Sequence, residues 1–368
     1  MRFTEFSGEW KEELLDRIAT LSKGIGIPKE QLSEDGDPCI LYGELYTKYK
    51  SEIIKQVESK TDIDGSKLKR SKANDVIIPC SGETAVDIAT ARCVPFDSIL
   101  LGGDLNVISL HKYDGAFMSY QLNGKRKYDI ARVAQGVSVV HLYGEHLKTI
   151  KTYNPTLPEQ QKIAILLSLL DERIATQNKI IDKLQSLIKG ISNKIFATIQ
   201  GIEYRMGNIV TISNGNSNVQ DAVTESKDGL YPFFDRSEDI KYLFLFDKEA
   251  IIYPGEGAEF MPRYFRGKFA LHQRCYAIFD FKEIINAQFL YFYLKTQNSY
   301  FVRNAVGSTV PSLRLNTFQK LKVIIPPKKI QHSVSLCLSS MEQKCNVEKD
   351  ILQKLLKQKQ YLLRQMFI

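Results

Sequence analysis

The longest regular pattern of hydrophobic positions in this chain lies in its middle, in residues 157–196. Hydrophobic residues recur there in alternating steps of four and three, which is the heptad pattern of a coiled coil. Pro158 favours a helix start, because its missing N–H needs no partner in the first turn. A long amphipathic helix packed on its own domain is the alternative, but helices of globular domains are usually far shorter. The seam consists of Ile163, Leu167, Leu170, Ile174, Gln177, Ile181, Leu184, Ile188, Ile191 and Ile195.

A second heptad seam ends the chain, and each of its positions lies 171 residues after one in the first seam. The same offset relates Gly136 to Gly307 and Pro155 to Pro326, upstream of the two predicted helices. Between residues 134–196 and their second copy, 13 of 63 positions are identical, and these glycine and proline matches exceed what any two heptad seams share. They indicate an internal repeat. The second seam consists of Val334, Leu338, Met341, Cys345, Glu348, Leu352, Leu355, Lys359, Leu362 and Met366.

The repeat continues upstream with different spacing. Residues 14–24 resemble residues 205–215 at an offset of 191, and residues 74–79 resemble residues 248–253 at an offset of 174. Constant frames around different interiors suggest one scaffold that presents two different surfaces. We therefore expect a first domain in residues 1–156, a spacer helix in 157–198, a second domain in 199–327 and a C-terminal spacer helix in 328–368.

Inside both expected domains, short strand-like stretches alternate with glycine turns and one or two helical segments. This mixture predicts a small α/β domain in each half. The expected fold class is therefore mixed α/β, with two related domains separated by two long helices.

Composition changes this picture only in part. The formal net charge of +8 permits an anionic partner such as nucleic acid without demanding one. The six cysteines form no C-x-x-C pair, so we expect reduced thiols in a cytoplasmic protein, not disulfides or metal ligands. The five histidines have no metal-ligand spacing, and the N-terminus lacks the apolar segment of a signal peptide. No run is apolar enough to span a membrane.

Motifs of catalysis are missing from the sequence. There is no P-loop, no G-x-G-x-x-G, no G-x-S-x-G and no [ND]-P-P-[YF], the tetrapeptide that holds the target amine in amino-methyltransferases. No pair of carboxylates stands out as a general acid and base. We therefore expect no catalytic residue, no metal and no cofactor on this chain.

Basic and aromatic residues are interleaved in three clusters of the variable domain interiors. Arg and Lys can neutralise phosphates and donate to guanine in the major groove. Each residue alone is as readily an ordinary exposed charge beside core aromatics, but the clusters together favour contact with nucleic acid. The clusters contain Tyr46, Lys48 and Tyr49; then Lys125, Arg126 and Lys127; and then Arg263, Arg266, Lys268, His272 and Arg274.

Taken together, these features resemble the DNA-specificity subunit of a Type I restriction–modification enzyme. The resemblance covers nearly the whole chain and depends on the repeat frame, on "LPEQQKIAILLSLLDERI", on "YPGEGAEF" and on "GKFALHQRCYAIF". It implies two target-recognition domains that each recognise one half of a split double-stranded DNA sequence. It also implies that the two helices pair antiparallel and fix the spacing of the half-sites. Methyltransferase subunits would bind S-adenosylmethionine and modify adenine, and a motor-nuclease subunit can join them.

The resemblance also suggests where DNA contacts lie. Family position points to the glycine loops before the helices and to the variable interiors. Lys268, His272 and Arg274 belong to a motif shared by members with different targets, so they are expected to contact phosphates or to support the scaffold. The further candidates are Ser138, Ser308 and Thr309 in the loops, and Asn216, Ser217, Arg236 and Arg263 as base contacts alongside Tyr46, Lys48 and Tyr49.

Two other classes of function stay open at this stage. A protein-binding adaptor with two repeat domains on a rigid spacer fits the helices and the missing motifs equally well, and salt-sensitive DNA binding would discriminate against it. An enzyme with an unrecognised site, such as a nuclease, is disfavoured because no carboxylate or histidine cluster suggests metal or general-base chemistry.

Overall fold

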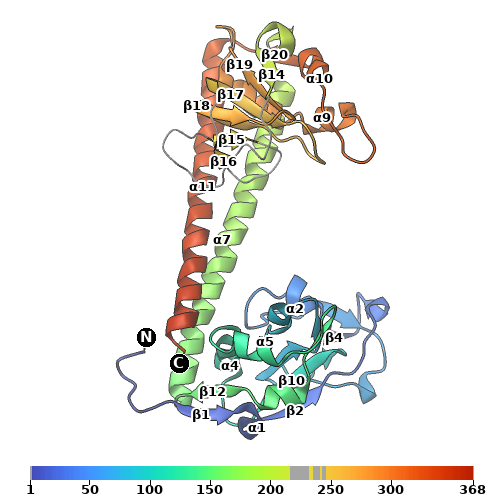
Figure 1. Ribbon diagram of the computed structural model, residues 1–368, viewed down its shortest axis with the longest axis vertical. Helices are drawn as coiled ribbons and strands as arrows, with labels where there is room; N and C mark the ends of the chain where they lie inside the picture. Colours follow the sequence, from blue (N-terminus) through green and yellow to red (C-terminus); the bar gives the residue numbers. More distant parts are fainter. Residues whose placement is uncertain (1, 216–231, 235–240, 243–245, 368) are drawn as a thin grey trace. The chain divides into compact units, whose positions relative to one another are not determined.

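The computed structural model describes residues 2–215, 232–234, 241–242 and 246–367. They form two compact units: unit 1 contains residues 1–179 and 350–368, and unit 2 contains residues 180–349. Two long helices, α7 (Leu157–Thr198) and α11 (Lys328–Gln365), contribute one part to each unit (Figure 1). No helix in the described ranges is long and hydrophobic enough to cross a membrane.

Unit 1 has a central antiparallel sheet in the order β2-β10-β6-β8. A second four-stranded sheet, β3-β5-β4-β9, and the pairs β1-β12 and β7-β11 complete its strands. Its elements besides the long helices are β1 (Lys11–Leu14), α1 (Leu15–Ile18), β2 (Ala19–Lys23), η1 (Lys29–Gln31), β3 (Leu32–Ser33), β4 (Asp37–Ile40), α2 (Glu44–Thr47), β5 (Ser59–Thr61), η2 (Gly65–Lys67), β6 (Asp75–Pro79), β7 (Ser81–Gly82), α3 (Ala85–Ile88), β8 (Arg92–Val94), β9 (Leu100–Leu101), β10 (Leu105–Leu110), α4 (Gly115–Asn123), α5 (Lys127–Val133), β11 (Val140–His141), α6 (Gly144–Lys148) and β12 (Lys151–Asn154).

Unit 2 has a sheet in the order β14-β19-β17-β18-β15-β16, and its strands β13 and β20 form a separate pair. Its elements besides the long helices are β13 (Ile202–Arg205), η3 (Met206–Asn208), β14 (Thr211–Asn214), β15 (Pro232–Phe234), β16 (Lys241–Tyr242), β17 (Phe246–Pro254), β18 (Arg263–Leu271), β19 (Cys275–Phe279), α8 (Ala287–Lys295), α9 (Asn298–Asn304), α10 (Leu315–Lys320) and β20 (Lys322–Ile325).

The sheets of the two units repeat each other strand by strand. In unit 1, β2 places Leu21 opposite Ile108 of β10. In unit 2, β14 places Ile212 opposite Ile278 of β19, and Leu21 and Ile212 are related by the predicted offset of 191. The order β2-β10-β6-β8 therefore corresponds to β14-β19-β17-β18, and β1-β12 corresponds to β13-β20. The predicted mixed α/β class, with two related domains and two long helices, is confirmed.

Sheet register corrects one offset of the repeat. Ile108 lies opposite Val76 on β6, and its equivalent Ile278 lies opposite Ile251 on β17. Val76 and Ile251 thus occupy the same place, 175 residues apart and not 174. The prediction was wrong by one residue because short runs of isoleucine match in either register. The loops that follow β6 and β17 shift by the same residue.

The seams of α7 and α11 are the faces that the structure covers, since all ten predicted positions of each helix are buried or partly buried. In unit 1 the beginning of α7 packs with the end of α11, and in unit 2 the end of α7 packs with the beginning of α11. Early residues of one helix therefore meet late residues of the other, so the helices are antiparallel. The packed residues include Ile163, Leu167, Leu170, Leu355, Leu362 and Met366 in unit 1, and Phe196 and Leu338 in unit 2.

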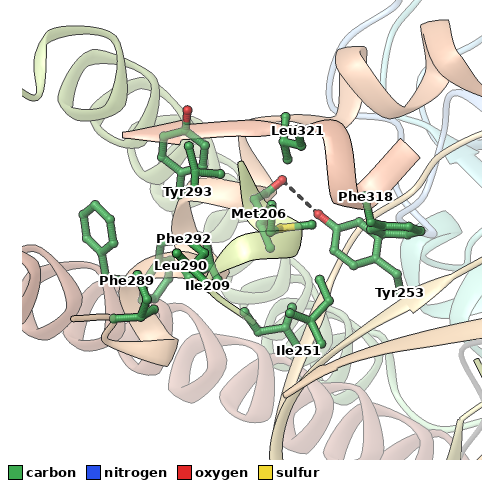
Figure 2. Close-up of a cluster of buried hydrophobic side chains, with 14 of the residues drawn as sticks. Met206, Ile209, Ile251, Tyr253, Phe289, Leu290, Phe292, Tyr293, Phe318 and Leu321 are labelled. Carbon is green, nitrogen blue, oxygen red and sulfur yellow. Dashed lines mark hydrogen bonds between the residues drawn. The ribbon is translucent and has the colours of Figure 1, made fainter. Parts of the chain in front are cut away.

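Each unit joins its domain core to a spacer helix through an aromatic contact. In unit 2, Phe196 of α7 lies 5.5 Å from Phe289 of α8, measured between ring centroids. In unit 1, Phe367 after α11 lies 5.4 Å from Phe117 of α4. Phe196 and Phe367 are related by the offset of 171, so the repeat preserves the contact. Figure 2 shows the core of unit 2, where the buried Tyr253 donates a hydrogen bond to Leu294 O at 3.2 Å.

Candidate nucleic-acid interface

Three loops meet at one end of the central sheet in unit 1: residues 80–82 after β6, residues 102–104 before β10, and residues 136–141. Cys80 N donates to Asp104 O at 2.7 Å, and β7 pairs with β11 so that Ser81 lies opposite His141. Ser81 Oγ also donates to Asp104 Oδ2 at 3.1 Å. These contacts join all three segments into one surface, hereafter the three-loop edge.

The three-loop edge of unit 2 consists of residues 255–257, 272–274 and 307–312. Gly255 N donates to Arg274 O at 2.8 Å, and Glu256 forms a β-bridge with Ser312. Arg274 Nη1 contacts Glu256 Oε1 at 2.8 Å and Oε2 at 2.9 Å. By sheet register, Arg274 occupies the place that Asp104 has in unit 1. The backbone of the edge is repeated, but the charge on the same turn has the opposite sign.

The glycine loops are closed by the same pairs of backbone hydrogen bonds in both units. Gln135 and His141 bond to each other in unit 1, as Val306 and Ser312 do in unit 2. Gly136 and Gly307 have φ values of +122° and +105°, a backbone conformation that other residues rarely adopt. Val137 at the first tip is 97% exposed. The predicted contact residues of both tips are exposed as well: Ser138, Ser308 and Thr309.

An exposed aromatic–basic group beside the unit 1 loop was missed by sequence reasoning. Tyr143 is 44% exposed, and its ring lies 6.1 Å from the ring of His141 and 5.5 Å from that of His146. Lys23 Nζ lies 5.6 Å from the Tyr143 centroid. The signal was available in "HLYGEH", which places ring side chains at short intervals directly after the glycine loop. Its equivalent in unit 2, by the offset of 171, has Arg314 in place of Tyr143.

Strand β18 exposes two of the predicted cations on one face. Arg266 and Lys268 are two positions apart, so they project from the same side of the sheet. Directly opposite on β17 lie Glu249, across from Arg266, and Asp247, across from Lys268. Cross-strand pairs of opposite charge stabilise a sheet modestly. This face is therefore mixed in charge, not purely basic.

The other predicted residues of this cluster lie nearer the three-loop edge or the sheet. His272 Nδ1 accepts a hydrogen bond from Arg274 N at 3.2 Å and so supports the turn that presents Arg274. Arg263 starts β18 opposite Ile252 and is partly buried. It occupies the place of Arg92 in unit 1, whose guanidinium is bonded to backbone carbonyls.

The first predicted cluster is largely internal. Tyr49 is 6% exposed and belongs to a hydrophobic core, so we leave it out of the interface. Lys48 Nζ lies 2.7 Å from Glu44 Oε1 and donates to Ser59 Oγ at 2.6 Å. Tyr46 is half-buried and its hydroxyl lies 3.4 Å from Ser81 O. Burial raises the pKa of both tyrosine hydroxyls above their ordinary value. A groove of about 780 Å³ lies beside these residues and includes Tyr42, Thr47 and Lys48 in its lining.

The second predicted cluster lies in the turn between α4 and α5. Lys125 is exposed. Arg126 lies over the Tyr153 ring at 5.1 Å and pairs with Asp129 at 3.2 Å, and burial lowers the pKa of the Lys127 ammonium. Two of the three cations therefore have roles inside the fold. Three further predicted residues, Asn216, Ser217 and Arg236, lie outside the described residues. Within the described ranges, no group of three His, Cys, Asp or Glu could hold a metal ion.

The family model described as "Type I restriction modification DNA specificity domain" matches residues 8–186 and 202–357. The chain belongs to this family. The two matched stretches together cover most of the chain and correspond to its two repeats, each with the three-loop edge and most of a spacer helix.

Among curated relatives of this specificity-domain family, the chain is similar to the Type I restriction enzyme EcoDI specificity subunit of Escherichia coli. The two are 31% identical over 123 residues, which are 33% of this chain. The aligned part spans 26% of that relative, about a quarter of its length.

Solved structures share the fold over nearly the whole chain. The S subunit of a Type I restriction–modification system from M. genitalium has a TM-score of 0.69 at 19% identity, covering 100% of this chain and 99% of that one. A structure described as the basis of complex assembly and conformational transition of the type I R-M system has a TM-score of 0.59 at 13% identity, covering 98% and 97%. At these identities the similarity establishes the fold alone.

Proposed function

We propose that this chain is the DNA-recognition subunit of a Type I restriction–modification complex and recognises a target in two parts. Residues 1–156 and 199–327 act as two target-recognition domains, each for one half-site. The spacer helices, residues 157–198 and 328–368, fix the distance between the half-sites. A helix of 42 residues such as α7 is about 63 Å long at about 1.5 Å per residue, close to two turns of DNA at about 34–36 Å each.

The repeated three-loop edge is the observation that supports this proposal. The same backbone presents Asp104 with Ser81 in one unit and Arg274 with Glu256 in the other. A carboxylate accepts hydrogen bonds from cytosine amino groups and repels phosphates, whereas a guanidinium donates to guanine or phosphate. Two frames of the same shape with different side chains suit two half-sites of different sequence.

Within this proposal, residue roles differ by position. The glycine-loop tips with Ser138, Ser308 and Thr309 have the same backbone in both units, so we assign them to contacts with the sugar–phosphate backbone. Arg266 and Lys268 take the same role on β18. We assign base contacts to the positions that differ between the units, among them Tyr143 and Arg274. Alanine at a base contact changes specificity at one or two positions, and alanine at a phosphate contact weakens all sites evenly.

The chain catalyses nothing in this proposal and directs partner subunits. S-adenosylmethionine binds to the methyltransferase subunits, and a motor-nuclease subunit can complete the restriction enzyme. Two exposed hydrophobic residues at equivalent places, Ile165 on α7 and Leu336 on α11, are 58% and 61% exposed. Exposed apolar residues at equivalent places on both spacer helices are suited to docking two copies of one partner.

Single-molecule methylation sequencing tests the proposal. Cells that express this chain with its methyltransferase subunit are compared with cells that lack the chain. A chain-dependent methyladenine motif in two parts, separated by a fixed gap, is expected. Absence of such a motif, with the methyltransferase expressed and assembled, would favour a protein-binding adaptor instead.

A further inference from the structure

Lys359 is a charged residue at a seam position of α11 where a heptad favours a hydrophobic side chain. Its side chain is 14% exposed, and its ammonium lies between two carboxylates of unit 1. Nζ is 2.5 Å from Glu52 Oε2 and 2.6 Å from Asp171 Oδ1. Glu52 follows α2 in the first domain and Asp171 lies on α7, so this single lysine joins the domain and both spacer helices.

Hydroxyl groups complete the contacts of Asp171. Tyr120 of α4 donates to Asp171 Oδ2 at 2.8 Å, and Ser51 Oγ donates to the same oxygen at 2.9 Å. Both donors belong to the first domain. Lys359 Nζ also lies 5.9 Å from the centroid of the Tyr120 ring. Hereafter, Glu52, Tyr120, Asp171 and Lys359 are the buried ion network.

The charges of this region balance only when all of its members are present. Glu52 and Asp171 provide two carboxylates, and Lys359 provides one cation. The second cation is Arg92, which is mostly buried and donates to the carbonyls of Tyr49, Ala91 and Leu45. Removing one partner leaves a buried charge without compensation, so each group requires the others in place.

Unit 2 is built differently at the equivalent positions. Glu342 on α11 is the residue 171 positions after Asp171, and it pairs with Lys295 of α8. The residue equivalent to Lys359 is Ile188 on α7, a hydrophobic seam residue. The cation of unit 2 therefore comes from the domain's own helix, and α7 has no charged residue at this seam position. If the buried ion network only served general stability, the repeat would not need a different arrangement in unit 1.

Buried ion pairs add little stability compared with hydrophobic residues of similar volume, but they require one geometry. A hydrophobic seam tolerates small rotations and sliding, whereas a lysine held by two carboxylates from different elements does not. We propose that Lys359 is a positioning residue that fixes the first domain on both spacer helices and thereby sets where its three-loop edge meets DNA. This inference rests on the proposed function.

The test uses the full chain assembled with its methyltransferase subunit. A triple variant, Glu52→Gln, Asp171→Asn and Lys359→Met, removes the three charges while nearly preserving side-chain volume. Methylation rates are measured on three duplexes: the target with its natural gap, and with the gap one base pair shorter or longer. We expect the preference of the unmodified chain for the natural gap to fall by about tenfold in the variant. Unfolding by urea is measured in parallel to show that the fold is retained.

A second variant covers the case in which the triple variant does not fold. Glu52→Gln alone keeps the pair between Lys359 and Asp171, and so removes only the charged link to the domain. It is also expected to weaken the preference for the natural gap. The matched control is Lys55→Ala, which removes an exposed ion pair between the same part of the domain and Glu172 of α7, 2.8 Å long. This control is expected to keep the preference.

The outcomes separate this inference from the proposed function. If the unmodified complex methylates no two-part target, the proposed function fails. If it does, and both folded variants keep the full preference for the natural gap, Lys359 does not position the domain and the inference fails. A lower rate on all three duplexes in equal proportion also overturns the inference, because it indicates a loss of general stability or assembly.

Discussion

Gln160 and Gln331 lie 171 residues apart, near the beginnings of α7 and α11, and are 1% and 0% exposed. Gln160 Oε1 accepts from Asp114 N at 2.9 Å, and its Nε2 donates to Pro155 O at 2.8 Å. Asp114 is the N-cap residue of α4, whose side chain accepts from Phe117 N. Gln160 thus ties the start of a domain helix to the start of a spacer helix, and we predict that Gln160→Ala loosens both.

The structure gives the size of this effect. Gln160→Ala leaves two buried backbone groups without partners, and each unsatisfied group costs about 1–3 kcal/mol. The expected loss is therefore about 2–4 kcal/mol. Gln331 accepts from Asn286 N and donates to both Pro326 O and Ile284 O, each at 2.8 Å, so Gln331→Ala loses three bonds. Its cost is expected to be larger by about 1 kcal/mol.

Hydrogen exchange followed by mass spectrometry is the suitable assay, because a chain with two units does not unfold in one step. Gln160→Ala should speed exchange at the start of α4 by about 30-fold or more, and Gln331→Ala should do so at the start of α8. Gln161→Ala, at the exposed neighbouring position, is the control and should change neither peptide. If Gln160→Ala leaves α4 as protected as this control does, the buried glutamines do not hold the helices as argued.

Three further predictions concern other parts of the chain. Gly136→Ala places a methyl group 2.1 Å from Val139 O at a positive φ, so it should lower thermal stability by about 1–3 kcal/mol, and Gly307→Ala, with 2.8 Å to the equivalent oxygen, should cost less. Burial raises the pKa of the Glu52 carboxyl beside Lys359 and Asp171, so the folded state keeps a proton longer and stability falls as pH rises from about 4.5 through the raised value; urea unfolding of Glu52→Gln should lack this decline. Cys337 is exposed and the five other thiols are buried, with the pKa of Cys93 raised to about 12, so an alkylating reagent should label one site quickly at pH 8 and none in Cys337→Ser.

The spacer helices were predictable because their signal is periodic and long. A seam that continues for more than four heptads averages over individual exceptions such as Gln177. The bounds of α7, Leu157–Thr198, match the expected start and end of the first spacer helix. The antiparallel pairing came from family resemblance and not from the heptads, because a heptad seam does not specify the direction of its partner.

The one-residue error between β6 and β17 shows what sequence comparison lacks. Hydrophobic runs of two or three residues align equally well in adjacent registers, and only the partner strand decides between them. Ile108 and Ile278 are those partners, and each lies about 30 residues from the strand that it fixes. No local pattern contains that information.

Candidate contact residues were the least predictable part. Lys48 and Arg126 look like free cations in the sequence, but Lys48 pairs with Glu44 and Arg126 pairs with Asp129. Tyr143 was overlooked because a single tyrosine has no periodic or compositional signal, although its neighbours His141 and His146 make it part of an exposed ring cluster. Charge and ring type are visible in a sequence, whereas exposure and pairing depend on the fold.

Comparing the two repeats separates scaffold from recognition more sharply than either repeat alone. Gly136 and Gly307 share a positive φ and the same loop closure, so they belong to the frame. Asp104 and Arg274 occupy one place on that frame with opposite charge, so no single DNA feature can satisfy both. If both edges contact DNA, the two half-sites must differ where these residues bind. Exchanging the residues, Asp104→Arg or Arg274→Asp, should then change the half-site of the altered domain and leave the other unchanged.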